Sequence, residues 1–144
     1  MKNEEAKKNV LVLCTGNSCR SQMAEGWLRY FAGDKAHIYS AGVEAHGLNG
    51  KAVAVMKEAG IDISSHTSKT VDDLHGIEFD IVLTVCDNAR EHCPYFPAKV
   101  MQLHKDFHDP ARATGTEEHI LQMFRSVRDE IKVYCQAFVI QHLK

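Results

Sequence analysis

Residues 10–21 constrain the fold more than any other stretch of the chain. They begin with four apolar positions, 10–13, which are typical of a buried strand, and continue into a loop of small and polar residues. Apolar residues at helical spacing follow at once, at Ala24, Trp27 and Leu28. A strand, a tight loop and a helix N-terminus in this order predict an anion site, because the loop N–H groups can converge and the helix dipole attracts negative charge.

This loop begins with the thiol of Cys14 and closes with the guanidinium of Arg20, in the spacing Cys-x5-Arg. N–H groups that hold an oxyanion also stabilise a thiolate, so we expect the pKa of Cys14 to lie below its ordinary value of about 8.5. Arg20 can hold two oxygens of a tetrahedral oxyanion. Asn17 is expected to bond across the loop, and Ser21 to donate a hydrogen bond to the thiolate. The predicted oxyanion-binding residues are Thr15, Gly16, Asn17, Ser18, Cys19, Arg20 and Ser21.

Length and composition place this loop in a small protein. The 144 residues predict a single domain, 1–144, and a net charge of −2 gives no general signal for nucleic acid or for a membrane surface. The charged N-terminal stretch precedes an apolar run too short for a signal peptide or a membrane span. We therefore expect a cytoplasmic protein, in which five cysteines are catalytic, redox-active or metal-binding rather than paired in structural disulfides.

Strand and helix patterns alternate along the remaining chain. Strands are expected at 37–40, 79–85 and 99–103, a short helix within 67–75, and helices at 48–59 and 116–142. Alternation of this kind predicts a parallel sheet with both faces covered, and ligands bind such sheets beyond the carboxyl ends of the strands. The side chains that follow the strands, Cys14, residues 40–46, Cys86 to Cys93 and residues 104–109, should therefore lie on one rim of the sheet.

Cys86 and Cys93 are separated by six residues, of which only Ala89 is apolar. Incidental packing is one interpretation of this pair, and a zinc site with His92 and His104 is another, although structural zinc pairs usually have two to four intervening residues. We favour a thiol relay. Reducing an oxyanion bound to Cys14 requires a second thiol to expel the product, and a third thiol to free Cys14.

Asp109 precedes Pro110 just beyond the fourth predicted strand. Asp-Pro is a common turn initiator. At this rim, however, a carboxylic acid could also donate a proton to the group that leaves when Cys14 attacks.

The run CTGNSCRSQMAEGW (14–27) resembles the low-molecular-weight tyrosine phosphatase superfamily, and within it the thioredoxin-coupled arsenate reductases. Further matching segments are 40–42, 46–49, 61–63, 85–86, 93–94, 109–111 and 124–131, which together span nearly the whole chain. The resemblance implies an α/β fold, a three-layer sandwich around a four-stranded parallel sheet of order 2-1-3-4.

The resemblance also implies a role for each matching residue. Cys14 attacks arsenate, Cys86 attacks Cys14 as arsenite leaves, and Cys93 then attacks Cys86. Asp109 is the acid, and Cys19 is dispensable. The Cys86–Cys93 disulfide is reduced by thioredoxin, or alternatively by glutaredoxin or another small thiol, and neither a bound cofactor nor a metal is expected. We predict that residues 86–97 form a mobile, polar loop that rearranges between the reduced and oxidised forms. Equal proteolysis and hydrogen exchange of this loop in both redox states would contradict this prediction.

Two other functions stay open. A tyrosine-type phosphatase would use Cys14, Arg20 and Asp109 in the same way and leave the later cysteines idle. A zinc-bound or thiol redox sensor would not turn over.

Some relatives bind a monovalent cation behind the loop, near the positions of Glu25 and Ser40, with an acidic residue where this chain has Lys69. We expect the Lys69 ammonium to replace that ion.

Overall fold

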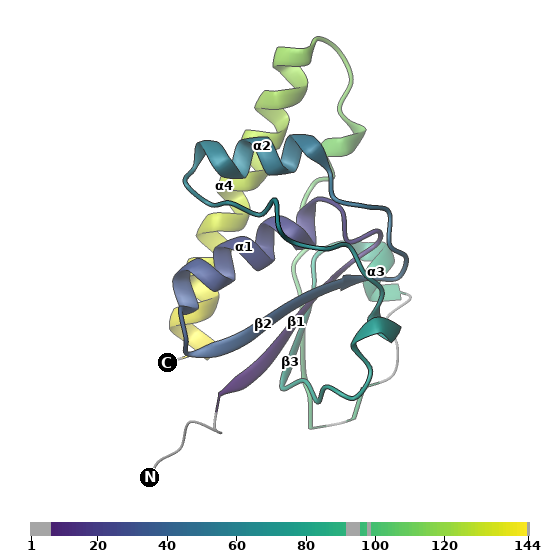
Figure 1. Cartoon of the computed structure of the whole chain (residues 1–144), viewed down its shortest axis with the longest axis vertical. Coiled ribbons are helices and arrows are strands. Elements are labelled where there is room, and N and C mark those ends of the chain that lie inside the picture. The colour runs from purple at the N-terminus through teal and green to yellow at the C-terminus, as the bar shows by residue number, and fades with distance from the viewer. Residues whose placement is uncertain (1–6, 92–95, 98, 144) are drawn as a thin grey trace.

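The computed structural model describes residues 7–91, 96–97 and 99–143. Figure 1 shows how its helices and strands are arranged. The elements follow one another as β1 (Lys8–Cys14), α1 (Arg20–Ala32), β2 (Ala36–Gly42), α2 (Gly50–Glu58), the 3-10 helix η2 (Val71–Leu74), β3 (Ile81–Thr84), α3 (Asp87–Glu91), β4 (Met101–His104), the 3-10 helix η3 (Pro110–Arg112) and α4 (Glu117–His142).

The four strands form a parallel sheet in the order β2-β1-β3-β4, which confirms the expected topology. In the register, Cys14 lies opposite Gly42, and Leu13 lies opposite Thr84. Thr84 in turn lies opposite His104 on the edge strand. The carboxyl ends of all four strands therefore meet at one rim, and Cys14 stands at the end of a central strand.

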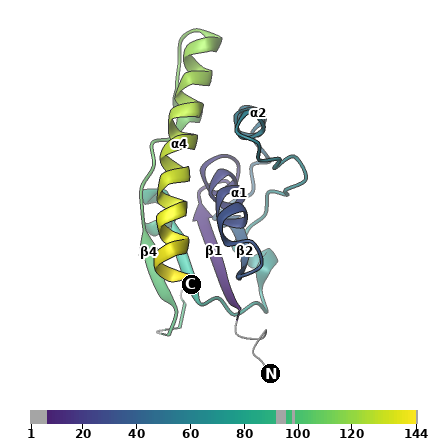
Figure 2. The same ribbon diagram turned by 90° about the vertical axis from the view of Figure 1, so that its left-hand side faces the viewer.

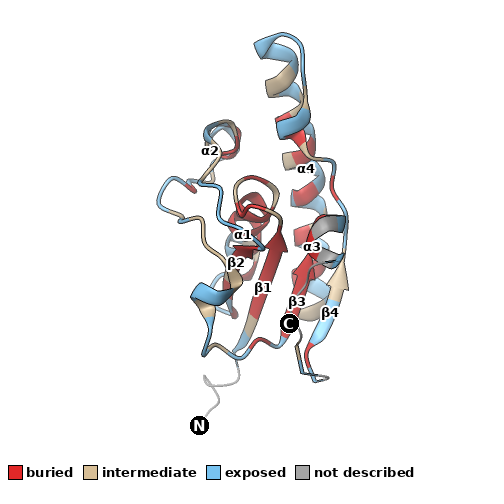
Figure 3. Ribbon diagram, turned by 90° about the vertical axis from the view of Figure 1, so that its right-hand side faces the viewer, coloured by how far each residue is buried: buried red, intermediate tan, exposed pale blue. Residues whose placement is uncertain are grey.

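Both faces of the sheet are covered, because residues 10–13 of β1 have no exposed surface at all. Figures 2 and 3 view the molecule from opposite sides and show α1 and α4 on the same face of the sheet. Ser40 points to that face and bonds to Glu25 of α1, so its neighbour Tyr39 points to the other. There Tyr39 and Phe96 both contact the Phe79 ring. The short helix η2 is part of the layer on this second face.

Local signals set the ends of the helices where the sequence predicts them. Gly33 ends α1 with φ of 58°, a left-handed conformation that glycine adopts without strain. The side chains of Asn49 and Thr116 cap the first turns of α2 and α4. In the polar stretch 67–75, where a short helix is predicted, the structure has the four-residue η2. None of the helices in the described residues is both long and apolar enough to cross a membrane.

Candidate active site

The loop between β1 and α1 contains one residue with a strained backbone conformation, Asn17, whose φ is 49°. Asparagine tolerates this left-handed region better than other non-glycine residues. Its buried side chain donates from Nδ2 to Ser21 Oγ and Ser40 Oγ, both at 2.9 Å, and its Oδ1 accepts from the backbone N–H of Lys69 at 2.9 Å. Gln22 Nε2 donates to the same oxygen at 3.1 Å. The expected bond across the loop is confirmed, and it extends to β2 and to the segment before η2.

Segment 43–49 holds the outer side of the loop. Its backbone N–H groups donate to the loop carbonyls of Cys14, Thr15, Gly16 and Ser18 at 2.9–3.2 Å. All described peptide bonds are trans, so the N–H of each peptide plane points away from its carbonyl. With their carbonyls turned outward, the loop peptides direct N–H groups inward, which is the arrangement of an anion-binding nest.

Two glycines permit this close approach. A Cβ on Gly42 would lie 2.2 Å from the carbonyl oxygen of Glu44 and 2.7 Å from that of Thr15. A Cβ on Gly16 would lie 2.2 Å from Nδ1 of His46, whose ring covers the loop. A side chain at either position would displace segment 43–49 from the loop, and the loop carbonyls would lose their hydrogen bonds to this segment.

The loop opens into a cavity of about 370 Å³ at the carboxyl rim of the sheet. Its lining residues are Cys14, Thr15, Gly16, Ser18, Cys19, Arg20, His46, Cys86, Asp87, Asp106, Asp109, Ala111 and Arg112. The cavity thus brings together Cys14 and Arg20 of the loop with Cys86 and Asp109, which come from three separate parts of the sequence. The rim that the strand pattern predicts is confirmed for these residues.

Arg20 and Asp109 face each other across the cavity. Arg20 Nη2 lies 3.5 Å from Asp109 Oδ2, and Arg20 Nη1 donates to the Phe107 carbonyl at 3.0 Å. The other carboxylate oxygen of Asp109 accepts the backbone N–H of Ala111 at 3.0 Å and so caps η3, with Pro110 in the first turn. The Asp-Pro pair is therefore both a turn initiator and a carboxylate aimed at the cavity.

Cys14 and Cys86 are hydrogen-bonded to each other, and both are almost fully buried. The bond from the Cys14 thiol lowers the pKa of Cys86 to about 5, against the opposing effect of burial. Thr15 Oγ1, 3.3 Å from Cys86 Sγ, the Ala89 N–H at 3.4 Å and the charge of Arg20 lower it further. Donating that bond raises the pKa of Cys14, as does burial. The directions of the two pKa shifts favour the negative charge on Cys86 and the proton on Cys14.

The position of that charge differs from the expectation for Cys14 alone. The contacts of Cys86 with the Cys14 thiol, the Thr15 hydroxyl and the Ala89 N–H favour a thiolate at Cys86. Thr15, which the sequence predicts only as part of the oxyanion loop, is also a hydrogen-bond partner of Cys86 Sγ. Ser21 Oγ accepts a bond from Asn17 at 2.9 Å, and its predicted donation to the thiolate stays a prediction.

Directly after Cys86 the chain forms α3, where the sequence predicts a polar loop. That expectation is wrong for residues 87–91. Asp87 favours a helix start through the helix dipole, and Ala89 and Glu91 are good helix formers. The N–H of Ala89 donates to Cys86 Sγ from this first turn.

The predicted third thiol, Cys93, lies outside the described residues, and so does His92 of the zinc interpretation. The described residues contain no group of three or more His, Cys, Asp or Glu side chains that could hold a metal ion.

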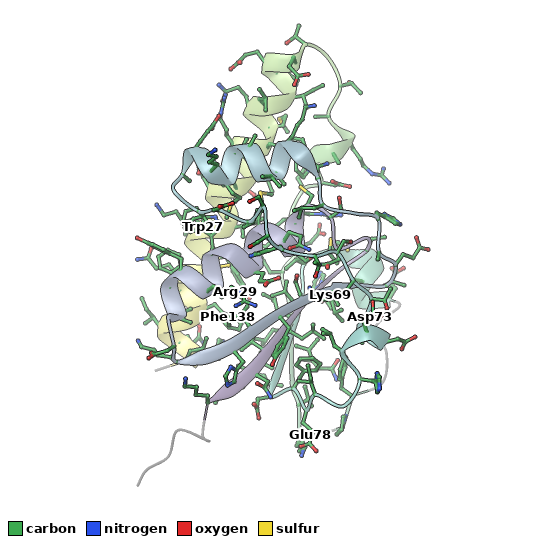
Figure 4. All side chains as sticks on the ribbon, in the orientation of Figure 1. Trp27, Arg29, Lys69, Asp73, Glu78 and Phe138 are labelled. Carbon is green, nitrogen blue, oxygen red and sulfur yellow. The ribbon has the colours of Figure 1, made fainter. Side chains whose placement is uncertain are left out.

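Behind the loop, Glu25 is buried among polar partners. It accepts from Ser40 Oγ at 2.6 Å and from Arg29 Nε at 2.8 Å. Lys69 Nζ donates to the Thr67 carbonyl at 2.9 Å, and burial lowers the pKa of Lys69 while the charge of Glu25 opposes that change. Figure 4 shows Arg29 on α1 and Lys69 on the segment before η2. Two positive charges therefore act on Glu25 behind the oxyanion loop: that of Arg29, in direct contact, and that of Lys69.

Three further residues have clear surroundings. Cys19 lines the cavity, and burial raises its pKa to about 12. Cys135 is buried in the core, on α4 against the Ala24 carbonyl. His46 also lines the cavity, and its Nε2 lies 2.6 Å from Glu44 Oε1. Sequence reasoning missed Arg112, another lining residue, although it stands three positions after Asp109 in the same turn.

Known proteins resemble this chain over most of its length. The family model described as low molecular weight phosphotyrosine protein phosphatase matches residues 9–144. An arsenate reductase of Bacillus licheniformis is 54% identical over 128 residues, which are 88% of this chain and 91% of that protein. An arsenate reductase of Bacillus subtilis is 54% identical over 124 residues, 86% of this chain and 89% of the relative. The solved structure of an arsenate reductase in the phosphate binding state superimposes with a TM-score of 0.77 at 28% identity, covering 95% of this chain and 99% of that one.

Proposed function

This chain belongs to the low molecular weight phosphotyrosine protein phosphatase family, and within it we propose that the chain reduces arsenate to arsenite. One observation carries the proposal. The cavity that can bind an oxyanion contains a second thiol, Cys86, in hydrogen-bond contact with the first, Cys14. A phosphatase needs one thiol at such a site, whereas reduction by thiols needs two. The arsenate reductases that are 54% identical to this chain support the same choice.

Binding comes first. Arsenate is a tetrahedral oxyanion, so its oxygens can accept the inward N–H groups of the loop and the planar fork of Arg20. Attack requires a thiolate at Cys14, so the proton of the Cys14 thiol passes to Cys86, and the charge of Arg20 and the backbone N–H of Thr15 stabilise the new thiolate. The nucleophile forms at Cys14 as the substrate binds.

The first bond-forming step is attack of the Cys14 thiolate on arsenic. A sulfur–arsenic bond forms, an arsenic–oxygen bond breaks, and Asp109 gives its proton to the departing oxygen, which leaves as water. Arsenic remains arsenic(V) in this step, because no electrons have been transferred to it. The charge of Arg20 stabilises the oxygens that remain.

Reduction occurs in the second step. Cys86 passes its proton to an oxygen of the adduct and attacks the sulfur of Cys14. A Cys14–Cys86 disulfide forms, the sulfur–arsenic bond breaks, and its electron pair stays on arsenic, so that arsenic(V) leaves as arsenite. Cys93 then attacks Cys86, which creates the Cys86–Cys93 disulfide and returns the thiolate to Cys14.

A dithiol outside the chain must reduce the Cys86–Cys93 disulfide. We propose thioredoxin, a dithiol with a potential of about −270 mV, with glutaredoxin or another small thiol as the alternative. A thiol-reducing compartment is required for this cycle, so we propose that it runs in the cytoplasm.

The experiment is arsenate-dependent oxidation of NADPH in the presence of thioredoxin and thioredoxin reductase. The parent protein should turn over many times, whereas Cys86→Ser and Cys93→Ser should each lose multiple turnover. Cys135→Ala, which removes a thiol from the core of α4 and not from the cavity, is the matched control and should turn over like the parent. A parent protein that hydrolyses aryl phosphates but produces no arsenite would overturn the proposal in favour of a phosphatase. Zinc in the purified protein together with no turnover would favour the sensor.

Cys86→Ser separates the two enzymatic functions within one molecule. It keeps Cys14, Arg20 and Asp109, so it should retain whatever aryl phosphatase activity the parent has. Loss of both activities in this variant would mean that Cys86 serves the structure of the site and not the transfer of electrons.

A further inference from the structure

His104 joins two points on the chain that flank Cys86. It is the last residue of β4, on the edge of the sheet, and lies opposite Thr84 in the register. Its Nδ1 is 2.7 Å from Thr84 Oγ1, and its Nε2 is 3.0 Å from Asp87 Oδ1. Thr84 ends β3 and Asp87 begins α3. One imidazole therefore holds both ends of a four-residue stretch whose third member is Cys86.

Both charge states of the imidazole preserve this arrangement. In the neutral ring, Thr84 Oγ1–H donates to Nδ1 and Nε2–H donates to the Asp87 carboxylate. In the charged ring, Nδ1–H donates to Thr84 Oγ1, which then donates to the Leu103 carbonyl 3.4 Å away. Because Nε2 carries a proton in both cases, the bond to Asp87 persists.

The remaining residue of the stretch, Val85, is fixed by its backbone. Its N–H donates to the Leu13 carbonyl at 2.9 Å, and its carbonyl accepts the N–H of Phe107 at 3.2 Å. The chain before Cys86 is thus part of the sheet, whereas the chain after it begins the short helix α3. Among the described side chains, the hydrogen bond between His104 and Asp87 ties the start of this helix to the sheet.

We infer that His104 is a positioning residue, which acts through Asp87 to hold the start of α3 and so keeps Cys86 Sγ against Cys14. The thiolate of Cys86 depends on this placement, because its donors come from Cys14, from Thr15 and from Ala89 of α3 itself. Without the bond to Asp87, α3 opens more often and Cys86 spends less time in contact with Cys14.

The first test needs no turnover. The reduced protein is treated with iodoacetamide at pH 8, and alkylation of each cysteine is followed by mass spectrometry of peptides. At this pH Cys86 stays ionised, since its pKa is about 5, so the rate reports opening and not ionisation. His104→Leu should speed alkylation of Cys86 about 3- to 10-fold, the effect of losing one hydrogen bond.

Controls within the same chain separate positioning from general loosening. Cys135 is a buried thiol in α4, away from the cavity, and should react at an unchanged rate in His104→Leu. His37→Leu removes an exposed histidine from β2 on the other side of the sheet and should leave Cys86 unchanged. His104→Gln places an N–H donor near the position of Nε2 and should restore part of the protection.

A double-mutant cycle tests whether His104 acts through Asp87. Asp87→Ala should itself expose Cys86, and His104→Leu should add nothing further in that background. Additive effects of the two substitutions, an unchanged Cys86 rate in His104→Leu, or equal acceleration at all cysteines would each overturn the inference.

The catalytic consequence rests on the proposed function. In single turnover without a reductant, His104→Leu should release arsenite about 3- to 10-fold more slowly while KM for arsenate stays within about twofold, because the oxyanion loop is untouched. A parent protein that forms no arsenite would refute the proposed function alone, and the alkylation result would still decide the role of His104. Slow release with an unchanged Cys86 alkylation rate would refute the positioning role alone.

Discussion

Replacement of Asn17 by alanine should destabilise the protein more than any other single polar substitution in the oxyanion loop. The side chain makes four hydrogen bonds, to Ser21, Ser40, Gln22 and the backbone of Lys69, all with partners at 2.9–3.1 Å. Each such bond contributes about 1 kcal/mol to stability. Their sum is about 4 kcal/mol, and an alanine in the left-handed region at φ 49° costs about 1 kcal/mol more.

The free energy of unfolding is measured by urea denaturation with linear extrapolation. Asn17→Ala should lower it by about 5 kcal/mol and Asn17→Gly by about 4 kcal/mol, because glycine adopts the left-handed conformation without strain. Asn49→Ala is the matched control. Asn49 caps α2 at the surface by accepting from Lys51 and Ala52, and its loss should cost only about 1 kcal/mol.

The comparison between the two asparagines decides the outcome. If Asn17→Ala destabilises no more than Asn49→Ala, the bonds across the loop carry no net stability, and the loop must be held by segment 43–49 alone. If Asn17→Gly is as harmful as Asn17→Ala, the left-handed backbone contributes nothing to the difference. Either result would refute the reasoning for that part of the sum.

Two further predictions concern charge at the site. The alkylation rate of Cys86 should stay level as the pH falls toward about 5 and drop below that pH, because the lowered pKa of Cys86 keeps its thiolate down to this point. Thr15→Val removes a hydrogen-bond donor and should move the midpoint of this pH profile upward. A midpoint in the parent near the pKa of an ordinary thiol would contradict the thiol pair. Turnover should be the same in potassium and sodium buffers of matched ionic strength, because the Lys69 ammonium adds to the charge of Arg29 the positive charge that a bound ion would supply near Glu25. Lys69→Ala should become potassium-dependent. Strong activation of the parent by potassium would exclude this role.

Much of the site could be predicted from the sequence because it depends on backbone topology. Once strands alternate with helices, residues that follow strands must share a rim, and this alone brings Cys14 and Cys86 to one cavity. Asn17 was also predictable, since few residues other than glycine accept a left-handed position in a tight loop. The order of the strands came from the resemblance and not from the pattern of apolar residues.

Contacts between side chains of neighbouring elements could not be predicted in this way. The bonds of Thr15 to Cys86 and of His104 to Asp87 depend on the register between strands and on a helix that begins directly after Cys86. The sequence of that helix is short and polar, which is equally compatible with a loop. Its helical form is favoured by the charge at its first residue and by donation of the Ala89 N–H to the sulfur of Cys86, neither of which leaves a periodic pattern.

The central place of β1 links ligand binding to the assembly of the whole sheet. Its partners β2 and β3 both arrive later in the chain, and the loop that follows it is closed by segment 43–49. A chain with an incomplete sheet therefore has no nest, so an oxyanion binds only the folded form. By mass action, an oxyanion present at one hundred times its dissociation constant stabilises that form by about 2.7 kcal/mol. Phosphate, with the same shape and charge as arsenate, would then be both a competitor for the cavity and a protector of the fold.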